Sequence, residues 1–384
     1  MTTSKYIIIL LSMSFFGLTS CIDEYWPEVS RYQNQLVVDG GISNELPPYT
    51  IKLSKSSPAN EIDYMPYSGC TLIIEDGDGE QEYLKETEEG TYQSSTNGMQ
   101  GSIGQKYRLK IQTPDGKSYE SDYDYIKNPV TIENVYAKTE TQESNEVDHT
   151  LYGYQFYVST ENTISDSNFY LWKLEYTSHY QSDYFIKYYY DGQVRLFQPI
   201  DSLFNCYYTG SVKSIYTFNT DQLTNKKLEN YPLHFVNTES RMLSLRYSLN
   251  VNQHTISKKA FKFWSALEEQ NSEQGSLYSR QPYQIQGNIK NVNDEGEPVL
   301  GYFLVSGVDT KRIFVDRPEV PFYYTDCTIN DGNYKQYAEL YWADPVFYPI
   351  YIIVYEGNRA VPGQPCADCR QRGGTIVKPE FWED

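Results

Sequence analysis

The residues with the most specific chemistry in this sequence of 384 residues are the cysteines of the motif Cys366-Ala367-Asp368-Cys369. A thioredoxin-type redox motif places its first cysteine at a helix N-terminus, but Pro365 precedes this one and no helical period follows the motif. A zinc site needs a second cysteine pair or a histidine pair at fixed spacing, and the four histidines are scattered. We therefore interpret the motif as a pair of structural disulfide cysteines and expect no metal site.

The N-terminus carries, in order, the features of an exported lipoprotein. Lys5 supplies a positive charge, residues 6–16 form a nearly unbroken apolar stretch, and residues 18–21 (Leu-Thr-Ser-Cys) resemble the bacterial lipobox. We therefore expect residues 1–20 to be a signal peptide and Cys21 to carry a covalent lipid. Two or three acyl chains on one cysteine anchor a protein firmly in a membrane. No other cofactor is expected.

The residues after Cys21 bear on the location of the protein. Residues 21–34 are polar and contain Pro27, so they predict a lipidated tether. Asp23 and Glu24 resemble the acidic surface-export signal of Bacteroidota lipoproteins. We therefore expect a protein that is lipid-anchored in the outer membrane and exposed at the cell surface.

The cysteine count predicts two disulfides. Six cysteines are present, and five remain when Cys21 is assigned to the lipid, so one of them has no partner within the chain. Cys70 is the only one of the five in the N-terminal third. An exported chain reaches an oxidising compartment, and we expect bridges among Cys206, Cys327, Cys366 and Cys369. Three connectivities are possible, and we prefer that Cys366 and Cys369 are joined separately to Cys206 and Cys327, which two of the three allow.

Tyrosine is the outlier of the composition, with 39 residues, and its clusters are candidate binding residues. A tyrosine ring offers a rigid apolar face and a hydroxyl group at a low cost in conformational entropy. The alternative, which we favour, is that these rings pack a β surface, because tyrosine is a good strand former. In the run from 188 to 190, alternation places at least one ring away from the core. The candidates are Tyr180, Tyr184, Tyr188, Tyr189, Tyr190, Tyr323 and Tyr324.

No motif for catalysis is present, so we expect a protein that is not an enzyme. The sequence contains no Gly-x-Ser-x-Gly, no His-Glu-x-x-His and no phosphate-binding loop. The acidic turn Asp76, Asp78 and Glu80 lacks the twelve-residue layout of a calcium loop, and we expect a hairpin turn there.

The charge excludes two classes of partner. The chain has 51 acidic and 32 basic residues, which gives a net charge of −19. A nucleic-acid or anionic-membrane binder needs a positive field, so we expect neither partner. Apart from the N-terminus, no apolar run is long enough to cross a membrane as a helix.

Hydrophobic alternation predicts a mainly β protein with two domains. Residues 35–127 contain short alternating segments with regular turn signals, which favour an immunoglobulin-like or transthyretin-like antiparallel sandwich. Gly40 and Gly41 predict a turn after its first strand. Residues 128–384 predict a larger β-rich domain, with one helix near 257–274 covering it and a C-terminal tail held by disulfides.

The C-terminal residues 365–370, 373–375 and 378–382 resemble the terminal signature of the DUF4249 family of Bacteroidota outer-membrane lipoproteins. The similarity extends to the first domain at residues 37–40, 90–92 and 107–109, and to the second at 281–282, 287–289 and 299–303. It covers nearly all of the chain after the signal peptide. Many relatives carry a further cysteine at the position of Ala367, so their disulfide count differs.

The resemblance implies a role in transport. Genes of this family often lie beside genes for TonB-dependent outer-membrane transporters. The expectation is therefore a non-catalytic surface lipoprotein that acts as an accessory or substrate-capturing partner of such a transporter. The alternative is a structural or adhesive cell-surface lipoprotein without a transport role. A hydrolase is the third hypothesis, and it requires a deep cleft with paired carboxylates. The sequence identifies no substrate.

Overall fold

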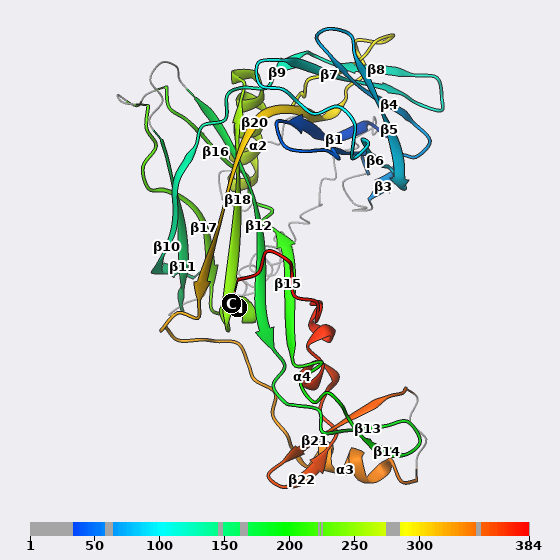
Figure 1. Cartoon of the computed structure of the whole chain (residues 1–384), viewed down its shortest axis with the longest axis vertical. Helices are drawn as coiled ribbons and strands as arrows, with labels where there is room; N and C mark the ends of the chain where they lie inside the picture. Colours follow the sequence, from blue (N-terminus) through cyan, green and yellow to red (C-terminus); the bar gives the residue numbers. More distant parts are fainter. Residues whose placement is uncertain are drawn as a thin grey trace, which may run out of the picture.

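The computed structural model describes residues 34–57, 64–144, 149–161, 168–221, 223, 226–273, 285–342 and 347–383. The predicted signal peptide, the lipidation site Cys21 and residues 21–33 of the tether lie outside the described residues. The expectation of a mainly β fold is confirmed. Among the described residues, no helix is long and apolar enough to cross a membrane. Figure 1 shows three parts: an N-terminal sandwich beside the upper end of a central sandwich, and a smaller part at the lower end that we name the foot.

The N-terminal sandwich is built from nine short strands. Their alternating apolar residues, such as Leu72, Ile74 and Leu109, are buried in one core cluster. Most neighbours pair antiparallel, and β4 lies between β5 and β7. The strands are β1 (Leu36–Ser43), β2 (Thr50–Lys55), β3 (Met65–Pro66), β4 (Thr71–Asp76), β5 (Gln81–Glu88), β6 (Thr91–Gln93), β7 (Lys106–Gln112), β8 (Ser118–Ser121) and β9 (Asp124–Tyr125).

Two later segments complete this sandwich. Strand β19 (Ile289–Asn291) pairs with β8, and the first part of β20 (Leu300–Asp316) runs parallel to β1. Phe303 of β20 is fully buried in the same core. The predicted domain boundary at residue 127 therefore does not separate the two cores, because the core of the N-terminal sandwich contains residues from before and after this boundary.

The turn that we expected at Gly40 and Gly41 is wrong, because both residues lie inside β1. A Cβ atom on Gly41 would lie 2.0 Å from the carbonyl oxygen of Leu304 on the parallel neighbour. Glycine is therefore required here because another backbone approaches closely, a situation in which glycine often occurs inside strands.

The central sandwich packs a long sheet against a three-stranded sheet. The long sheet contains β12 (Phe169–Gln181), β15 (Asn205–Ser211), β16 (Tyr216–Asn219), β18 (Arg246–Ile256) and the second part of β20. The smaller sheet contains β10 (Ile132–Glu143), β11 (Thr150–Thr160) and β17 (Tyr231–Asn237). Phe156, Trp172 and Tyr247 are buried between them. The short helix η1 (Arg241–Leu243) lies near the end of β12.

The expected covering helix is present as α2 (Lys258–Glu273), and the predicted last residue, 274, lies outside the described residues. Ser257 accepts a hydrogen bond from the backbone N–H of Ala260 and so caps its first turn. Ala260 and Phe263 pack against Leu171 of β12 and Leu304 of β20. The helix therefore covers the face of β12 that points away from the central core.

The foot comprises residues 182–204, 326–342 and 347–373 and has its own small sheet. Its strands are β13 (Tyr188–Tyr190), β14 (Val194–Leu196), β21 (Ile350–Tyr355) and β22 (Asn358–Ala360). Its helices are α3 (Asp331–Glu339), α4 (Gln364–Ala367) and η2 (Cys369–Arg372). The sequence did not predict α3. In Figure 1 the foot lies at the end of the molecule opposite the N-terminal sandwich.

Two disulfides join the C-terminal segment to the rest of the chain. Cys206 of β15 is bonded to Cys369, and Cys327 is bonded to Cys366. The two cysteines of the motif thus have different partners, as we preferred. Cys70 is buried and unpaired. Beyond the bridges, Trp382 is buried and its ring packs on those of His179, Tyr207 and Phe314.

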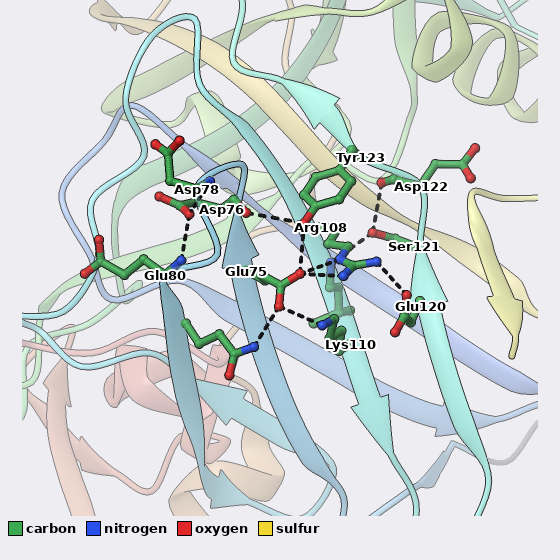
Figure 2. Close-up of polar contacts among 12 residues, drawn as sticks. Glu75, Asp76, Asp78, Glu80, Arg108, Lys110, Glu120, Ser121, Asp122 and Tyr123 are labelled. Carbon is green, nitrogen blue, oxygen red and sulfur yellow. Dashed lines mark hydrogen bonds and ion pairs between the residues drawn. The ribbon is translucent and has the colours of Figure 1, made fainter.

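A network of charges surrounds Glu75 on the sheet of the N-terminal sandwich. Figure 2 shows the side chains of Arg108, Lys110 and Tyr123 pointing toward its carboxylate. Burial acts to raise the pKa of Glu75, but hydrogen bonds from Lys110, Gln81, Arg108 and Tyr123 outweigh it and lower the pKa to about 2. Only 7% of this side chain is exposed. The carboxylate therefore stays ionised in the folded protein at neutral pH.

The acidic turn after Glu75 forms the expected hairpin between β4 and β5. A carboxylate oxygen of Asp76 accepts hydrogen bonds from the backbone N–H groups of Asp78 and Glu80, both at 2.9 Å. This oxygen is used to close the turn, as in other Asx turns.

We predict that Cys206→Ala combined with Cys369→Ala lowers the free energy of unfolding by up to about 5 kcal/mol. The bridge spans 163 residues, and closing so long a loop removes much entropy from the unfolded chain. Denaturant unfolding of the full chain under non-reducing conditions measures the loss. Cys70→Ala is the control, because it removes a buried cysteine without opening a bridge. A double variant no less stable than this control would contradict the prediction.

We also predict that Glu75→Gln destabilises the protein at neutral pH by about 2–3 kcal/mol. The folded pKa lies below the unfolded one, so the stabilisation is present above the ordinary pKa of glutamate and is lost as the pH falls toward 2. Unfolding measured from pH 7 to pH 2 should show the two proteins converging at the acidic end. Glu120→Gln is the control, since the Glu120 side chain is 38% exposed and forms an ion pair with the same Arg108. Parallel pH curves for wild type and Glu75→Gln would refute the role of Glu75.

Candidate binding site

The seven candidate tyrosines lie in three different places. Tyr180 is buried at the end of β12, where its hydroxyl donates to the carbonyl oxygen of Cys369 at 2.9 Å and accepts from the N–H of Gly374 at 3.0 Å. Burial raises the pKa of Tyr180. Its hydroxyl group therefore fastens the C-terminal segment to the central sheet, which is a structural role.

Tyr184 and Tyr324 also lie near the place where the central sandwich meets the foot. The hydroxyl of Tyr184 donates to the carbonyl oxygen of Cys327 at 2.7 Å. The ring of Tyr324 lies 4.5 Å from the guanidinium carbon of Arg241. Tyr323, by contrast, is 45% exposed and packs beside the ring of His149 on the central sandwich.

Tyr188, Tyr189 and Tyr190 form β13 in the foot, and their faces alternate as expected. Tyr189 packs against Phe197, which belongs to the core of the foot. Tyr188 lies opposite Leu196 in the ladder, and Leu196 is 52% exposed. Tyr188 and Tyr190 therefore contribute to the outer face of the sheet.

A cavity of about 370 Å³ opens where the central sandwich meets the foot. Strands β12 and β15 supply one wall, η1 supplies a second, and the segment after the Cys206–Cys369 bridge supplies a third. We name this cavity the junction pocket. It is lined by Ser178, Tyr180, Tyr208, Arg241, Met242 and Arg372.

The polar end of the junction pocket consists of two arginines fixed by one acid. Nη2 of Arg241 and Nη2 of Arg372 each lie 2.6 Å from a different oxygen of Asp183. The Asp183 side chain is only 7% exposed, whereas Asp326, which also contacts Arg241, is 75% exposed. Two positive charges therefore meet one buried negative charge, and the lining carries an excess of positive charge.

The junction pocket is unsuited to a metal ion in its present form. Asp183 lies near the sulfur atoms of Cys327 and Cys366, a combination that holds metals elsewhere. Here the two sulfurs are bonded to each other, so neither is a thiolate. The charged groups of the lining are the guanidinium groups of Arg241 and Arg372, which bind anions.

A second candidate is an exposed apolar surface on the foot, which we name the foot surface. Trp342 is 73% exposed and Phe347 is 71% exposed, values that are unusual for such large rings. Beside it, Arg359 lies over the ring of Tyr188 and donates to the hydroxyl of Tyr337, which is hydrogen-bonded to the hydroxyl of Tyr341. The foot surface comprises Leu196, Tyr341, Trp342, Phe347, Tyr348 and Val354.

Sequence reasoning did not identify the arginines that make the junction pocket positive or the aromatic residues of the foot surface. Arg372 lies three residues after the motif, in a stretch where the sequence shows no helical period. Arg241 is far from it in sequence, and no local signal connects the two. Tyr341 and Trp342 follow α3, which the sequence did not predict, so their exposure had no signal in the sequence beyond two adjacent aromatic residues.

We predict that Tyr180→Phe lowers the free energy of unfolding by about 1–3 kcal/mol, because a carbonyl oxygen and an N–H lose their partner. Denaturant unfolding gives the value, and limited proteolysis should show earlier cleavage after Cys369. Tyr208→Phe is the matched control, since Tyr208 is 37% exposed. Equal effects of the two substitutions would count against the structural role of Tyr180.

Comparisons with known proteins bear on the family. No match to the chain was found among curated proteins. A solved DUF4785 family protein of Legionella pneumophila shares 10% identity, with 57% of this chain and 52% of that chain covered and a TM-score of 0.17. The chain thus spans about half the length of that protein, and so weak a similarity supports no conclusion.

The family comparison is specific. The family described as "Domain of unknown function (DUF4249)" matches residues 22–312, which is more than half of the chain. The terminal signature at 365–382 lies beyond the matched residues. The match confirms the resemblance seen in the sequence, and the chain belongs to the DUF4249 family.

Proposed function

We propose that this protein is a non-catalytic surface lipoprotein that acts as an accessory, substrate-capturing partner of a TonB-dependent outer-membrane transporter. The observation that carries the proposal is the exposed aromatic surface of the foot. A pocket lies where the foot meets the central sandwich. Exposed apolar patches of this kind are typical of protein contacts, and tryptophan, tyrosine and arginine dominate their binding energy.

The position of the foot supports a role in contacting a partner. The predicted lipid on Cys21 precedes Leu36, the first residue of β1, by 15 positions, and β1 belongs to the N-terminal sandwich. The foot is at the opposite end of the molecule (Figure 1). A tether of this length spans at most about 54 Å. The sandwich is therefore held near the outer membrane, while the foot is the part free to reach a neighbouring protein.

The features of the site favour binding over hydrolysis. Ser306 and His254 form a hydrogen-bonded pair of 2.9 Å beside a cavity of about 210 Å³, which resembles part of a catalytic triad. Burial lowers the pKa of His254 to about 3. Such a ring is a poor base at neutral pH, and Ser306 is only 1% exposed. We therefore interpret the pair as a buried hydrogen bond.

The second candidate function is a structural or adhesive surface lipoprotein without a transport role. The same foot surface favours it, since an exposed aromatic patch suits any large partner. The two functions differ in what deletion of the gene does. An adhesive protein predicts altered attachment or envelope integrity, whereas an accessory predicts slower growth on the nutrient of its transporter.

We predict that the native protein, tagged through a flexible linker after residue 384, recovers a large β-barrel transporter from solubilised outer membranes. Tyr341→Ser combined with Trp342→Ser should reduce this recovery at least tenfold, because aromatic anchors carry much of the binding energy of an interface. Quantitative mass spectrometry of the eluates measures it.

The matched control is Tyr83→Ser, because Tyr83 is 62% exposed but lies on β5 of the N-terminal sandwich. It should leave the recovery unchanged. Recovery of the lipoprotein alone would contradict the accessory role, and equal recovery with all three proteins would exclude the foot surface from the contact.

A further inference from the structure

We propose that the junction pocket binds a small organic carboxylate that has an apolar or aromatic body. Only the identification of this ligand as the captured substrate rests on the proposed function. The binding itself depends on the geometry of the pocket.

The arginines are already held in position for an anion. Asp183 accepts one hydrogen bond from each guanidinium and so orients both, while Nε of Arg372 donates to the carbonyl oxygen of Pro365. Within the described part of the chain, Nη1 of Arg241 and Nη1 of Arg372 have no hydrogen-bond partner. A group whose charge and rotamer are fixed before binding loses little entropy when a ligand arrives.

The balance of charge selects a single negative charge. Arg241 and Arg372 together exceed Asp183 by one positive charge. Asp326 also contacts Arg241, at 2.9 Å, but its carboxylate is 75% exposed, and an ion pair that faces water contributes little. A monovalent carboxylate matches both this charge and the planar, forked geometry of guanidinium groups.

The remaining walls determine the body of the ligand. Met242 is an adaptable apolar side chain, and the rings of Tyr180 and Tyr208 are rigid. The ring of Tyr208 also contacts that of Tyr176, which joins the pocket to the core of the central sandwich. A volume of about 370 Å³ is near the lower limit for small-molecule sites. The ligand is therefore of the size of one or two amino acids.

The experiment compares matched probes on the wild-type full chain in detergent. Titration calorimetry at millimolar concentrations would measure N-acetylglycine, N-acetylleucine and N-acetyltyrosine, the corresponding amides, and inorganic phosphate. We expect at least one acid to bind, to bind at least tenfold more tightly than its amide, and to weaken as sodium chloride is added. We also expect N-acetyltyrosine or N-acetylleucine to exceed N-acetylglycine.

Variants then locate the binding. Tyr208→Ala should weaken the binding of the preferred acid several-fold. Arg241→Lys keeps the positive charge but should also weaken binding, because lysine lacks the paired N–H donors of the guanidinium group. Tyr83→Ala, on a distant strand, should change nothing. Circular dichroism and thermal unfolding establish that each variant is folded. An acid that binds Arg241→Lys and Tyr208→Ala as tightly as wild type binds elsewhere, and the proposal is then overturned.

Three other outcomes would also overturn it: no binding of any acid, equal binding of acid and amide, or binding of phosphate alone. These results are independent of the transporter experiment. Carboxylate binding without recovery of a transporter would leave the site in place and remove the accessory role. Recovery of a transporter without carboxylate binding would do the reverse.

Discussion

The attachment of the C-terminal segment to β12 and β15 is the constraint on which the lower half of the molecule depends. The Cys206–Cys369 bridge, the hydroxyl of Tyr180 and the shared carboxylate of Asp183 all act at this point. The foot itself has only a small core, centred on Ile186 and Ile353, and cores of this size usually need covalent support. The same contacts hold Arg372 opposite Arg241, so the pocket exists because the tail is fastened there.

Much of the fold could be predicted, because strands and helices are encoded locally. The alternation in β4 and β7 and the cap at Ser257 gave the sandwich and α2 correctly. The parallel pairing of β1 with β20 could not be predicted in this way, since more than 250 residues separate the two strands. The glycines of β1 were misinterpreted for the same reason: the backbone that requires them comes from a distant part of the chain.

The candidate site was only partly accessible to sequence reasoning. Cysteines in an exported protein have few roles, so the motif at 366–369 led to the disulfides. A tyrosine has several roles, because the same ring can pack in a core, donate a hydrogen bond or bind a ligand. Tyr180 and Tyr184 proved to hold the backbone of the C-terminal segment. The two arginines of the pocket come together only through the fold, and their partner Asp183 is an ordinary acid in the sequence.

Strand β20 passes through two sandwiches, and this continuity has a mechanical consequence. Its backbone pairs with β1 up to Ser306 and with β18 from Gly307 onward, without a linker between the two ladders. At the change-over, a Cβ atom on Gly307 would lie 2.0 Å from the carbonyl oxygen of Lys127, so the chain that enters the central sandwich is packed tightly against it. The two sandwiches therefore share one uninterrupted strand. A force applied to β1 would pass into β20 and be transmitted along it to Asp316, which pairs with Arg246 at the start of β18.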